Sequence, residues 1–259
     1  LSLYVHVPFC AHVCYYCACN KVVTGSRSRA EPFLENLYRE IRLQASLVDP
    51  SRRVEQLHWG GGTPTFLSDR QVCDLMYVIG DNFYLHEDDR GEYSIEIDPR
   101  ELREDTLATL REIGFNRISI GVQDFNPDVQ KAVHREQSNE LTLGAMREAR
   151  RLGYRSINID LMYGLPLQTV ESFSETLDAV IEAAPDRLSV FNYAHLPGRF
   201  KPQRRIRQAD LPGPVDKLNI LALTIDKLTA AGYEYLGMDH FARRDDELVS
   251  AQRNGSLHR

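Results

Sequence analysis

Hydrophobic and polar residues along this chain follow two alternating patterns, one typical of strands and the other of amphipathic helices. Residues 1–7 are mostly β-branched or aromatic and partly alternate in polarity, which predicts a strand that Pro8 ends. Residues 31–47 carry apolar side chains at helical spacing, with Pro32 in the first turn, which predicts a helix. The same patterns predict further strands at 54–59, 93–97, 116–121, 156–162, 187–191 and 235–238, and further helices at 68–83, 101–113, 127–134, 138–152, 169–184 and 215–231.

Local signals mark the ends of several predicted helices. Ser68 and Gln71 have the spacing of a capping box at a helix start. Gly114, Gly153 and Gly232 each follow a predicted helix and precede an aromatic residue and a strand. Strict alternation of strand and helix indicates parallel βα units, as in a doubly wound sheet or a barrel. Because no dinucleotide fingerprint follows the first strand, we predict an α/β fold with a parallel (β/α) partial TIM-type barrel.

Polar or glycine-rich residues follow each predicted strand, which is where a parallel barrel gathers its functional side chains. Gly60 to Gly62 permit close approach of a ligand to the backbone. Glu96 lies on an apolar strand, where an isolated carboxylate is costly to bury, so we expect a cationic partner. Tyr4 and His6 share one face of the first strand. The other polar residues of this predicted rim are Thr63, Asp98, Gln123, Asp124, Asp160, Asn192, Tyr193, His195, Asp239 and His240.

Four of the five cysteines lie within ten residues, directly after the first strand, as Cys10, Cys14, Cys17 and Cys19. Clustered thiolates are soft ligands that suit zinc, Cu(I) or an iron–sulfur cluster. A structural zinc site usually recruits two separated pairs of ligands, and the CxxxCxxC spacing also differs from ferredoxin-type runs. Spacing alone therefore leaves both zinc and an iron–sulfur cluster open. The fifth cysteine, Cys73, is predicted to be a core residue of a helix.

The stretch from residue 198 to residue 207 is strongly basic and contains no acidic residue. Its charged residues are Arg199, Lys201, Arg204, Arg205 and Arg207. Two interpretations are open. The stretch is either a solvated surface loop or a clamp for an anionic ligand, since arginine forks match carboxylates.

Composition narrows the class of protein. The chain has 259 residues, with 42% hydrophobic and 26% charged, as in globular domains. A net charge of −6 argues against general attraction to nucleic acid. We see no run of apolar residues that approaches a membrane span and no signal peptide, and five cysteines are too few for a disulfide scaffold. We therefore expect a cytoplasmic protein with reduced thiols.

The CxxxCxxC run after a first strand resembles the signature of radical S-adenosylmethionine (radical SAM) enzymes. Other stretches narrow the resemblance to the oxygen-independent coproporphyrinogen III oxidase (coproporphyrinogen dehydrogenase) family. These are Tyr4-Val-His-Val-Pro-Phe-Cys10, Asn20-Lys21, His58-Trp-Gly-Gly-Gly-Thr-Pro64, Ser94-Ile-Glu-Ile-Asp-Pro99, Ser119-Ile-Gly-Val-Gln-Asp124, Asn158-Ile-Asp-Leu161, Phe191-Asn-Tyr-Ala-His195 and Gly237-Met-Asp-His-Phe-Ala242. The related haem-chaperone branch typically lacks the ending Cys17-Ala-Cys19.

The resemblance implies that Cys10, Cys14 and Cys17 bind three irons of a 4Fe–4S cluster and leave the fourth iron open for SAM. Cys19 is then a near neighbour and not a ligand. The resemblance implies Tyr4, His6 and Glu96 as catalytic residues. It implies contacts to SAM, with room for a second SAM molecule, from Tyr4, Tyr16, Gly61, Gly62, Thr63, Glu96, Gln123, Arg135, Asp160 and Ala194.

The implied activity is an oxidoreductase step of anaerobic haem biosynthesis. A 5′-deoxyadenosyl radical abstracts a β-hydrogen from a propionate of coproporphyrinogen III, and loss of CO2 and one electron leaves a vinyl group. Two rounds give protoporphyrinogen IX. The implied partners are coproporphyrinogen III and an electron donor protein, with no nucleic acid and no membrane, and we expect a monomer. The alternatives are a radical-SAM-like haem chaperone that binds the cluster and a tetrapyrrole without this turnover, and a structural zinc protein.

The ends of the chain suggest a division into domains. The chain starts inside a predicted strand without Met and ends without a closing element, so we expect it to be a fragment. The family it resembles carries an additional N-terminal segment and a mostly helical C-terminal domain. We therefore assign residues 1–240 to the catalytic barrel and residues 241–259 to the start of a connection to a further domain.

Overall fold

In the computed structural model, which describes residues 1–257, the chain forms two compact units. The first unit comprises Leu1–His12, Cys19–Ser119 and Arg147–Arg155. The second unit comprises Val13–Ala18, Ile120–Met146 and the described part of Ser156–Arg259. The chain between Cys10 and Cys19 therefore passes from the first unit to the second and back.

Parallel strands form the centre of the first unit. Strand β1 (Ser2–Val7) pairs with β4 (Gln56–Gly61), and β4 pairs with β5 (Glu92–Ile97), both in parallel. Along β5, partly buried and fully buried residues alternate, because polar and apolar residues alternate in its sequence. Strand β6 (Arg117–Gln123) begins in this unit and ends in the second. Short strands β2 (Phe9–Cys10) and β3 (Val22–Val23) pair separately and were not predicted.

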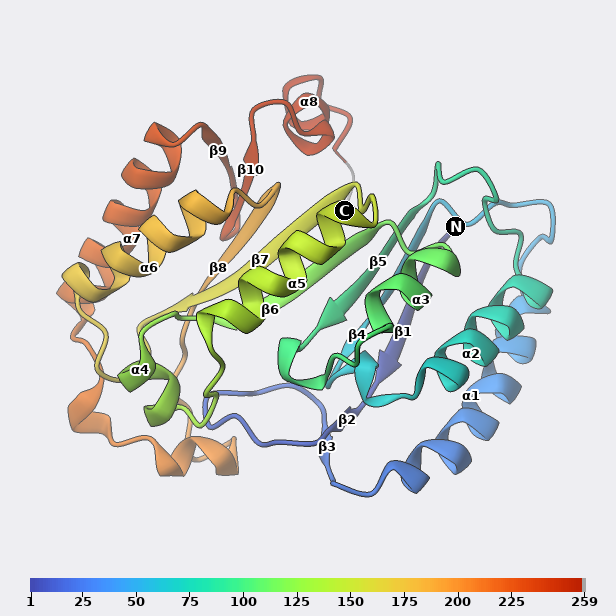
Figure 1. Ribbon diagram of the computed structural model, residues 1–259, viewed down its shortest axis with the longest axis horizontal. Coiled ribbons are helices and arrows are strands. Elements are labelled where there is room, and N and C mark those ends of the chain that lie inside the picture. The colour runs from blue at the N-terminus through green and yellow to red at the C-terminus, as the bar shows by residue number, and fades with distance from the viewer. Residues whose placement is uncertain (258–259) are drawn as a thin grey trace. The chain divides into compact units, whose positions relative to one another are not determined.

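Three helices of the first unit pack in sequence, α1 (Ala30–Ala45) on α2 (Asp69–Asn82) and α2 on α3 (Thr106–Glu112) (Figure 1). The capping box of α2 is confirmed, since the Ser68 side chain accepts from the Gln71 backbone N–H and the reverse bond is present. Short 3₁₀ turns, η1 (Arg27–Arg29) and η2 (Pro64–Phe66), precede α1 and α2. Cys73 is half-buried on α2, so its assignment to the core was wrong.

The helix predicted at 101–113 is instead two pieces. A 3₁₀ turn, η3 (Pro99–Glu101), follows β5 directly, and α3 starts only at Thr106. The Asp98 side chain accepts from the Arg100 backbone N–H at 3.1 Å and so caps η3. The next residue, Leu102, returns to an extended conformation and interrupts the helix.

Strands β7 (Ser156–Tyr163) and β8 (Arg187–Asn192) of the second unit are parallel, as predicted. The last two strands, β9 (Tyr233–Gly237) and β10 (His240–Arg243), are antiparallel to each other, and β10 is antiparallel to β8. The expectation that every strand is parallel was therefore wrong after β8. The two-residue turn of Met238 and Asp239, both at positive φ, can join only antiparallel strands.

Helices α6 (Val170–Ala183) and α7 (Pro214–Ala230) of the second unit pack together. Helix α4 (Pro127–Ala132) lies in this unit, and α5 (Asn139–Arg151) runs from it into the first unit. The segment 192–214, in which we predicted no element, contains two 3₁₀ turns, η4 (Lys201–Arg205) and η5 (Gln208–Asp210).

The predicted boundary at residue 240 coincides with the first residue of β10. All but the first residue of β10 lies in the segment 241–259, and so does helix α8 (Glu247–Arg253). Residues 258 and 259 of that segment lie outside the described part of the chain. The division into a barrel and a connection stays a prediction.

The capping box of α2 gives a test of this local structure. Ser68→Ala removes the acceptor for the Gln71 N–H and should lower the free energy of unfolding by about 1 kcal/mol. Gln71→Ala leaves that bond in place and should lower the free energy of unfolding by a smaller amount. Urea unfolding of both variants measures the difference. Equal unfolding of wild type and Ser68→Ala would contradict the role of the cap.

Candidate functional site

Each of the three glycines at the end of β4 has a different neighbour that excludes a side chain. A Cβ on Gly60 would lie 2.6 Å from a carboxylate oxygen of Glu96, and one on Gly61 would lie 2.6 Å from the His6 ring. A Cβ on Gly62 would lie 2.7 Å from the backbone of Pro8. Gly61 also has a φ of +113°, which side chains disfavour. The triple glycine therefore lets β4 end in contact with Glu96, His6 and the backbone just before the cysteine segment (residues 10–19).

A row of aromatic and ionisable side chains crosses β1, β4 and β5 in the first unit. The Tyr4 hydroxyl and His6 Nδ1 share a hydrogen bond at 3.1 Å, and the Tyr4 ring stacks on His58 at 5.7 Å. His58 Nε2 lies 3.3 Å from Glu96 Oε1. Partial burial, the charge of Glu96 and then that of Cys19 raise the pKa of Tyr4. The predicted catalytic residues Tyr4, His6 and Glu96 thus lie in one connected group.

We expected a cationic partner for Glu96, and its contacts are a backbone N–H and a histidine. Its carboxylate accepts from the Gly61 backbone N–H at 3.1 Å and lies next to His58. The Glu96 side chain is 41% exposed, so solvation offsets much of the cost of its charge. The carboxylate oxygens therefore remain accessible beside the glycine backbone.

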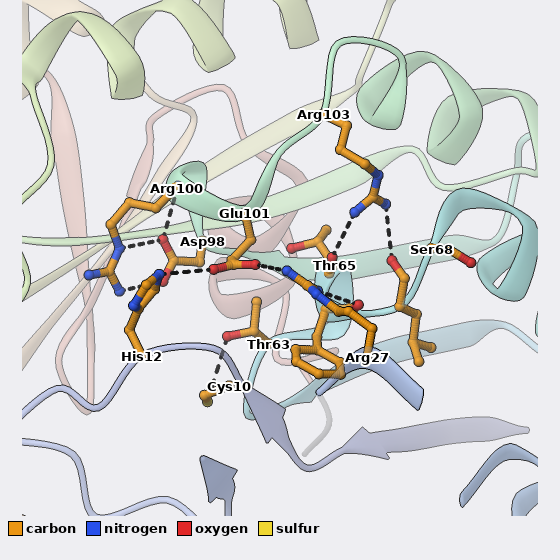
Figure 2. Close-up of polar contacts among 12 residues, drawn as sticks. Cys10, His12, Arg27, Thr63, Thr65, Ser68, Asp98, Arg100, Glu101 and Arg103 are labelled. Atoms are coloured by element: carbon orange, nitrogen blue, oxygen red, sulfur yellow. Dashed lines mark hydrogen bonds and ion pairs between the residues drawn. The ribbon is translucent and has the colours of Figure 1, made fainter. Parts of the chain in front are cut away.

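The first predicted metal ligand, Cys10, is fixed by short-range backbone pairing. Cys10 pairs with Val23 in the β2–β3 ladder, and its carbonyl accepts from the Thr24 N–H at 2.9 Å. The Thr63 hydroxyl donates to Cys10 Sγ at 3.7 Å (Figure 2). Thr63 directly follows the triple glycine of residues 60–62, and its N–H donates to the Phe9 carbonyl at 2.8 Å. Cys10 and the predicted SAM contacts Gly61 to Thr63 are therefore held together within the first unit.

Cys14 lies buried in the second unit against an arginine. Arg135 Nη1 donates to Cys14 Sγ at 3.6 Å, and Nη2 donates to the Gly121 carbonyl at 2.6 Å. A Cβ at Gly121 would lie 2.9 Å from Arg135 Nη2, so this glycine leaves room for the guanidinium. Arg135 is 6% exposed. A buried cation beside a thiol suits a negatively charged sulfur ligand.

Tyr15, which the sequence reading missed, holds the second-unit part of the cysteine segment from two sides. The Tyr15 ring stacks on His134 at 4.9 Å, and Arg205 Nη1 donates to the Tyr15 hydroxyl at 3.1 Å. The Tyr15 N–H donates to the Val133 carbonyl at 2.9 Å, and His134 Nδ1 lies 2.8 Å from the Val13 carbonyl. Residues 13–15 are therefore attached to the end of α4 and to η4.

A buried glutamine, Gln203, joins two predicted SAM contacts. Its side-chain amide donates to the Tyr16 carbonyl at 2.9 Å and to the Ala194 carbonyl at 3.2 Å. Gln203 is 1% exposed. Nothing in the sequence marked Gln203, because one glutamine within a basic run has no characteristic pattern. Arg205 belonged to that run, and its contact with Tyr15 shows that this arginine supports the cysteine segment.

Three other arginines of the basic run contact residues close to them in sequence. Arg207 forms an ion pair with Asp210 at 2.5 Å, and Arg204 donates to the Pro197 carbonyl at 3.0 Å. Arg199 lies over the ring of Phe200 at 5.5 Å. The anion clamp stays a prediction.

The remaining predicted SAM contacts of the second unit, Gln123 and Asp160, lie on the strands β6 and β7. Gln123 is the last residue of β6, is 9% exposed and has a φ of +70°. Asp160 lies on β7, and its carboxylate accepts from the Asn158 side-chain amide at 2.8 Å. The left-handed backbone of Gln123 turns the chain sharply into Asp124.

Asp124 is a buried carboxyl with several donors. It is 1% exposed and accepts from the Thr176 hydroxyl at 2.6 Å, the Gln168 amide at 2.5 Å and the Asn126 N–H at 2.8 Å. Desolvation nevertheless outweighs these bonds and raises the pKa of Asp124 above its ordinary value. Asp124 therefore links the turn that follows β6 with helix α6.

The three predicted cluster ligands are divided between the units, with Cys10 in the first and Cys14 and Cys17 in the second. Among residues 1–257, no group of three or more His, Cys, Asp and Glu side chains is arranged as a metal site. The assignment of these cysteines as one ligand set stays a prediction. The donor set nevertheless fits an iron–sulfur group, since Cys10 and Cys14 each receive a hydrogen bond of the kind that tunes cluster sulfurs.

Comparison with protein families decides the class of this chain. Residues 4–180 match the family model described as the Radical SAM superfamily. The chain belongs to the radical SAM superfamily. Membership implies a 4Fe–4S cluster and SAM as its cofactors and confirms the predicted α/β fold of the radical SAM kind.

Curated relatives and a solved structure resemble the whole chain. The oxygen-independent coproporphyrinogen III oxidase of Pseudomonas aeruginosa is 59% identical over 100% of this chain and 56% of that protein. The enzyme of the same name from Escherichia coli is 56% identical over the same shares. A solved structure of coproporphyrinogen III oxidase from Escherichia coli, titled a radical SAM enzyme, has a TM-score of 0.96 and 55% identity, covering 100% of this chain and 59% of that one.

The chain thus spans 56–59% of the length of these relatives. Within residues 1–257, the search for a helix with the length and apolar character of a membrane span found none.

The contact between Arg205 and Tyr15 predicts how the cysteine segment responds to mutation. Arg205→Gln removes one side of the Tyr15 support, so residues 13–15 should open more often. We expect alkylation of Cys14 in the apo protein to accelerate on the order of fivefold, equivalent to about 1 kcal/mol of local stability. Peptide mass spectrometry under anaerobic conditions measures the rate.

Arg204→Gln is the matched control, because Arg204 neighbours Arg205 in sequence but, within residues 1–257, its side-chain hydrogen bond goes to the Pro197 carbonyl and not to Tyr15. It should leave the alkylation rate of Cys14 unchanged. Equal acceleration by both substitutions would mean that net charge, and not the Tyr15 contact, holds this segment.

The raised pKa of Asp124 gives a pH dependence with a definite sign. Its contribution to stability is complete below the ordinary carboxyl pKa and is lost as pH rises through the higher folded-state pKa. Asn does not ionise, so the stability advantage of wild type over Asp124→Asn should shrink as pH rises above the ordinary carboxyl pKa of about 4. Urea unfolding at a series of pH values measures this advantage. An advantage that grows with pH would show that the hydrogen bonds outweigh desolvation.

Proposed function

We propose that the protein decarboxylates two propionate side chains of coproporphyrinogen III oxidatively and so forms the vinyl groups of protoporphyrinogen IX. The observation that carries this proposal is identity of 59% and 56% across the entire chain with proteins named oxygen-independent coproporphyrinogen III oxidase. Each round removes one hydrogen atom, one CO2 and one electron from a propionate. Substrate, activity and partners are proposed here because the relatives extend well beyond this chain.

We propose Cys10, Cys14 and Cys17 as the ligands of the 4Fe–4S cluster, with one iron left open for SAM. When bound, the cluster and SAM together supply the electron and the hydrogen-abstracting chemistry. Three protein ligands leave a coordination position for a second molecule, as in other open metal sites. Cys19 is then a neighbour with a separate role.

The side chains of each unit have distinct tasks in this proposal. Gly61 and Gly62 expose backbone that SAM can approach, and Glu96 offers a carboxylate for its amino group. Arg135 supports Cys14, and Thr63 supports Cys10. Tyr4 and His6, which share a hydrogen bond, are proposed as catalytic residues together with Glu96, and Tyr4 also as a SAM contact. The other proposed SAM contacts are Tyr16, Gln123, Asp160 and Ala194.

We further propose that an electron donor protein supplies the reductant and that the enzyme acts in the cytoplasm as a monomer. The haem-chaperone alternative predicts that the cluster forms but that coproporphyrinogen III is not converted. The ending Cys17-Ala18-Cys19 and the names of the relatives favour the enzyme.

Turnover under anaerobic conditions tests the proposal. The full-length protein, reconstituted with iron and sulfide, should convert coproporphyrinogen III to protoporphyrinogen IX with SAM and a reductant, releasing two CO2 for each substrate. Chromatography of the oxidised porphyrin products measures conversion. Assembly of the cluster and binding of haem without product would instead favour the chaperone.

Cysteine variants test the assignment of three ligands. Cys14→Ala should abolish the iron–sulfur absorption of the reconstituted protein, because it removes a ligand. Cys19→Ala should retain that absorption. Loss of the cluster in both variants to the same degree would show that Cys19 is also a ligand. Uptake of zinc without any iron–sulfur absorption would support the structural zinc site.

A further inference from the structure

One carboxylate in the first unit contacts one residue within the segment that carries the cysteines and one residue beyond it. Glu101 Oε1 lies 3.4 Å from His12 Nε2, and Glu101 Oε2 accepts from Arg27 Nη2 at 2.5 Å (Figure 2). His12 lies two residues after Cys10, whereas Arg27 lies beyond the last cysteine of the segment. Glu101 therefore joins the chain just after Cys10 to the chain beyond Cys19, with one carboxylate oxygen for each contact.

Arg27 is itself fixed by further contacts. Its Nη1 donates to the Phe66 carbonyl, and its guanidinium lies over the Phe66 ring at 4.2 Å. Phe66 belongs to η2, which follows the glycine segment directly. The two prongs of the guanidinium thus connect η2 and Glu101, a geometry that the single ammonium of a lysine does not reproduce.

Glu101 is buried, with a side chain 6% exposed, although it lies on a short turn and not in a strand or long helix. A carboxylate at such a site requires compensation by a cation. Arg27 supplies that charge. The turn η3 follows β5, so Glu101 lies five residues after Glu96, one of the proposed SAM contacts.

We propose that Glu101 is a positioning residue for the iron–sulfur cluster, acting through His12 and Arg27. Its carboxylate sets where the Cys10 end of the cysteine segment lies relative to the ends of β4 and β5, which carry Gly61 and Glu96. This inference rests on the proposed cluster ligand Cys10. It does not depend on the identity of the substrate.

Within residues 1–257, the first unit contains a matched ion pair that makes no side-chain bond to the cysteine segment. Arg103 binds Asp69 at 2.6 Å and donates to the carbonyls of Thr65 and Leu67, at 3.3 and 3.0 Å. Arg103 therefore holds the same η2 region as Arg27, through similar bonds (Figure 2). A purely structural role of Arg27 predicts equal effects from the two arginines.

The test compares Arg27→Lys and Glu101→Gln with Arg103→Lys in the full-length protein after anaerobic reconstitution. Two measurements are made without substrate, namely the rate of iron release to a chelator and the change in the electron paramagnetic resonance spectrum of the reduced cluster when SAM is added. For Arg27→Lys and Glu101→Gln we expect release to accelerate on the order of tenfold, the lower end of effects for residues that orient metal ligands. We also expect the spectral response to SAM to weaken. Arg103→Lys should match wild type in both.

Iron release within twofold of wild type in both Arg27→Lys and Glu101→Gln would overturn the proposal. Equal acceleration by Arg103→Lys would also overturn it, because general loosening of η2 would then explain the effect. Glu101→Gln and Arg27→Lys keep the volume or the charge of the original residue, so they report on the contact if an alanine variant fails to fold. Failure of coproporphyrinogen III turnover would leave these measurements and their interpretation unchanged.

Discussion

The cysteine segment depends on contacts made by other elements, because it has little regular structure of its own. Apart from Cys10 at the end of β2, its cysteines lie outside helices and strands. The thiols of Cys10 and Cys14 are therefore positioned by neighbours within the same unit, Thr63 for Cys10 and Arg135 for Cys14. A metal ligand held in this way needs support from its surroundings, because ligand geometry follows the groups that orient it.

These supports come from residues distant in sequence, which explains how far the sequence could predict them. Periodicity identified most strands and helices, and Ser68 and Gln71 marked the start of α2 correctly. The β9–β10 hairpin was missed because Met238 and Asp239 adopt positive φ without a glycine at the turn. Tyr15, Gln203 and Glu101 carried no local signal, since their roles arise from tertiary contacts. Resemblance to a family could name SAM and the cluster, whereas spacing alone left zinc open.

Charge distribution explains why the segment can remain ordered around anionic sulfur. Arg135 lies against Cys14, Arg205 against Tyr15, and Arg27 neutralises Glu101. Each guanidinium makes at least one further bond or ring contact to its own unit, so it is oriented before any cofactor binds. The chain thus supplies positioning and electrostatics, while the reactivity belongs to the cofactors.

The proposed site requires that three cysteines hold a cluster whose fourth iron is open to SAM. Electron paramagnetic resonance of the reconstituted and reduced protein, recorded with SAM labelled by ¹⁷O in its carboxylate, tests it directly. We predict a 4Fe–4S signal that changes on addition of SAM and is broadened or split by hyperfine coupling to the label. A 4Fe–4S signal that is identical with and without labelled SAM would contradict the open site and the assignment that depends on it.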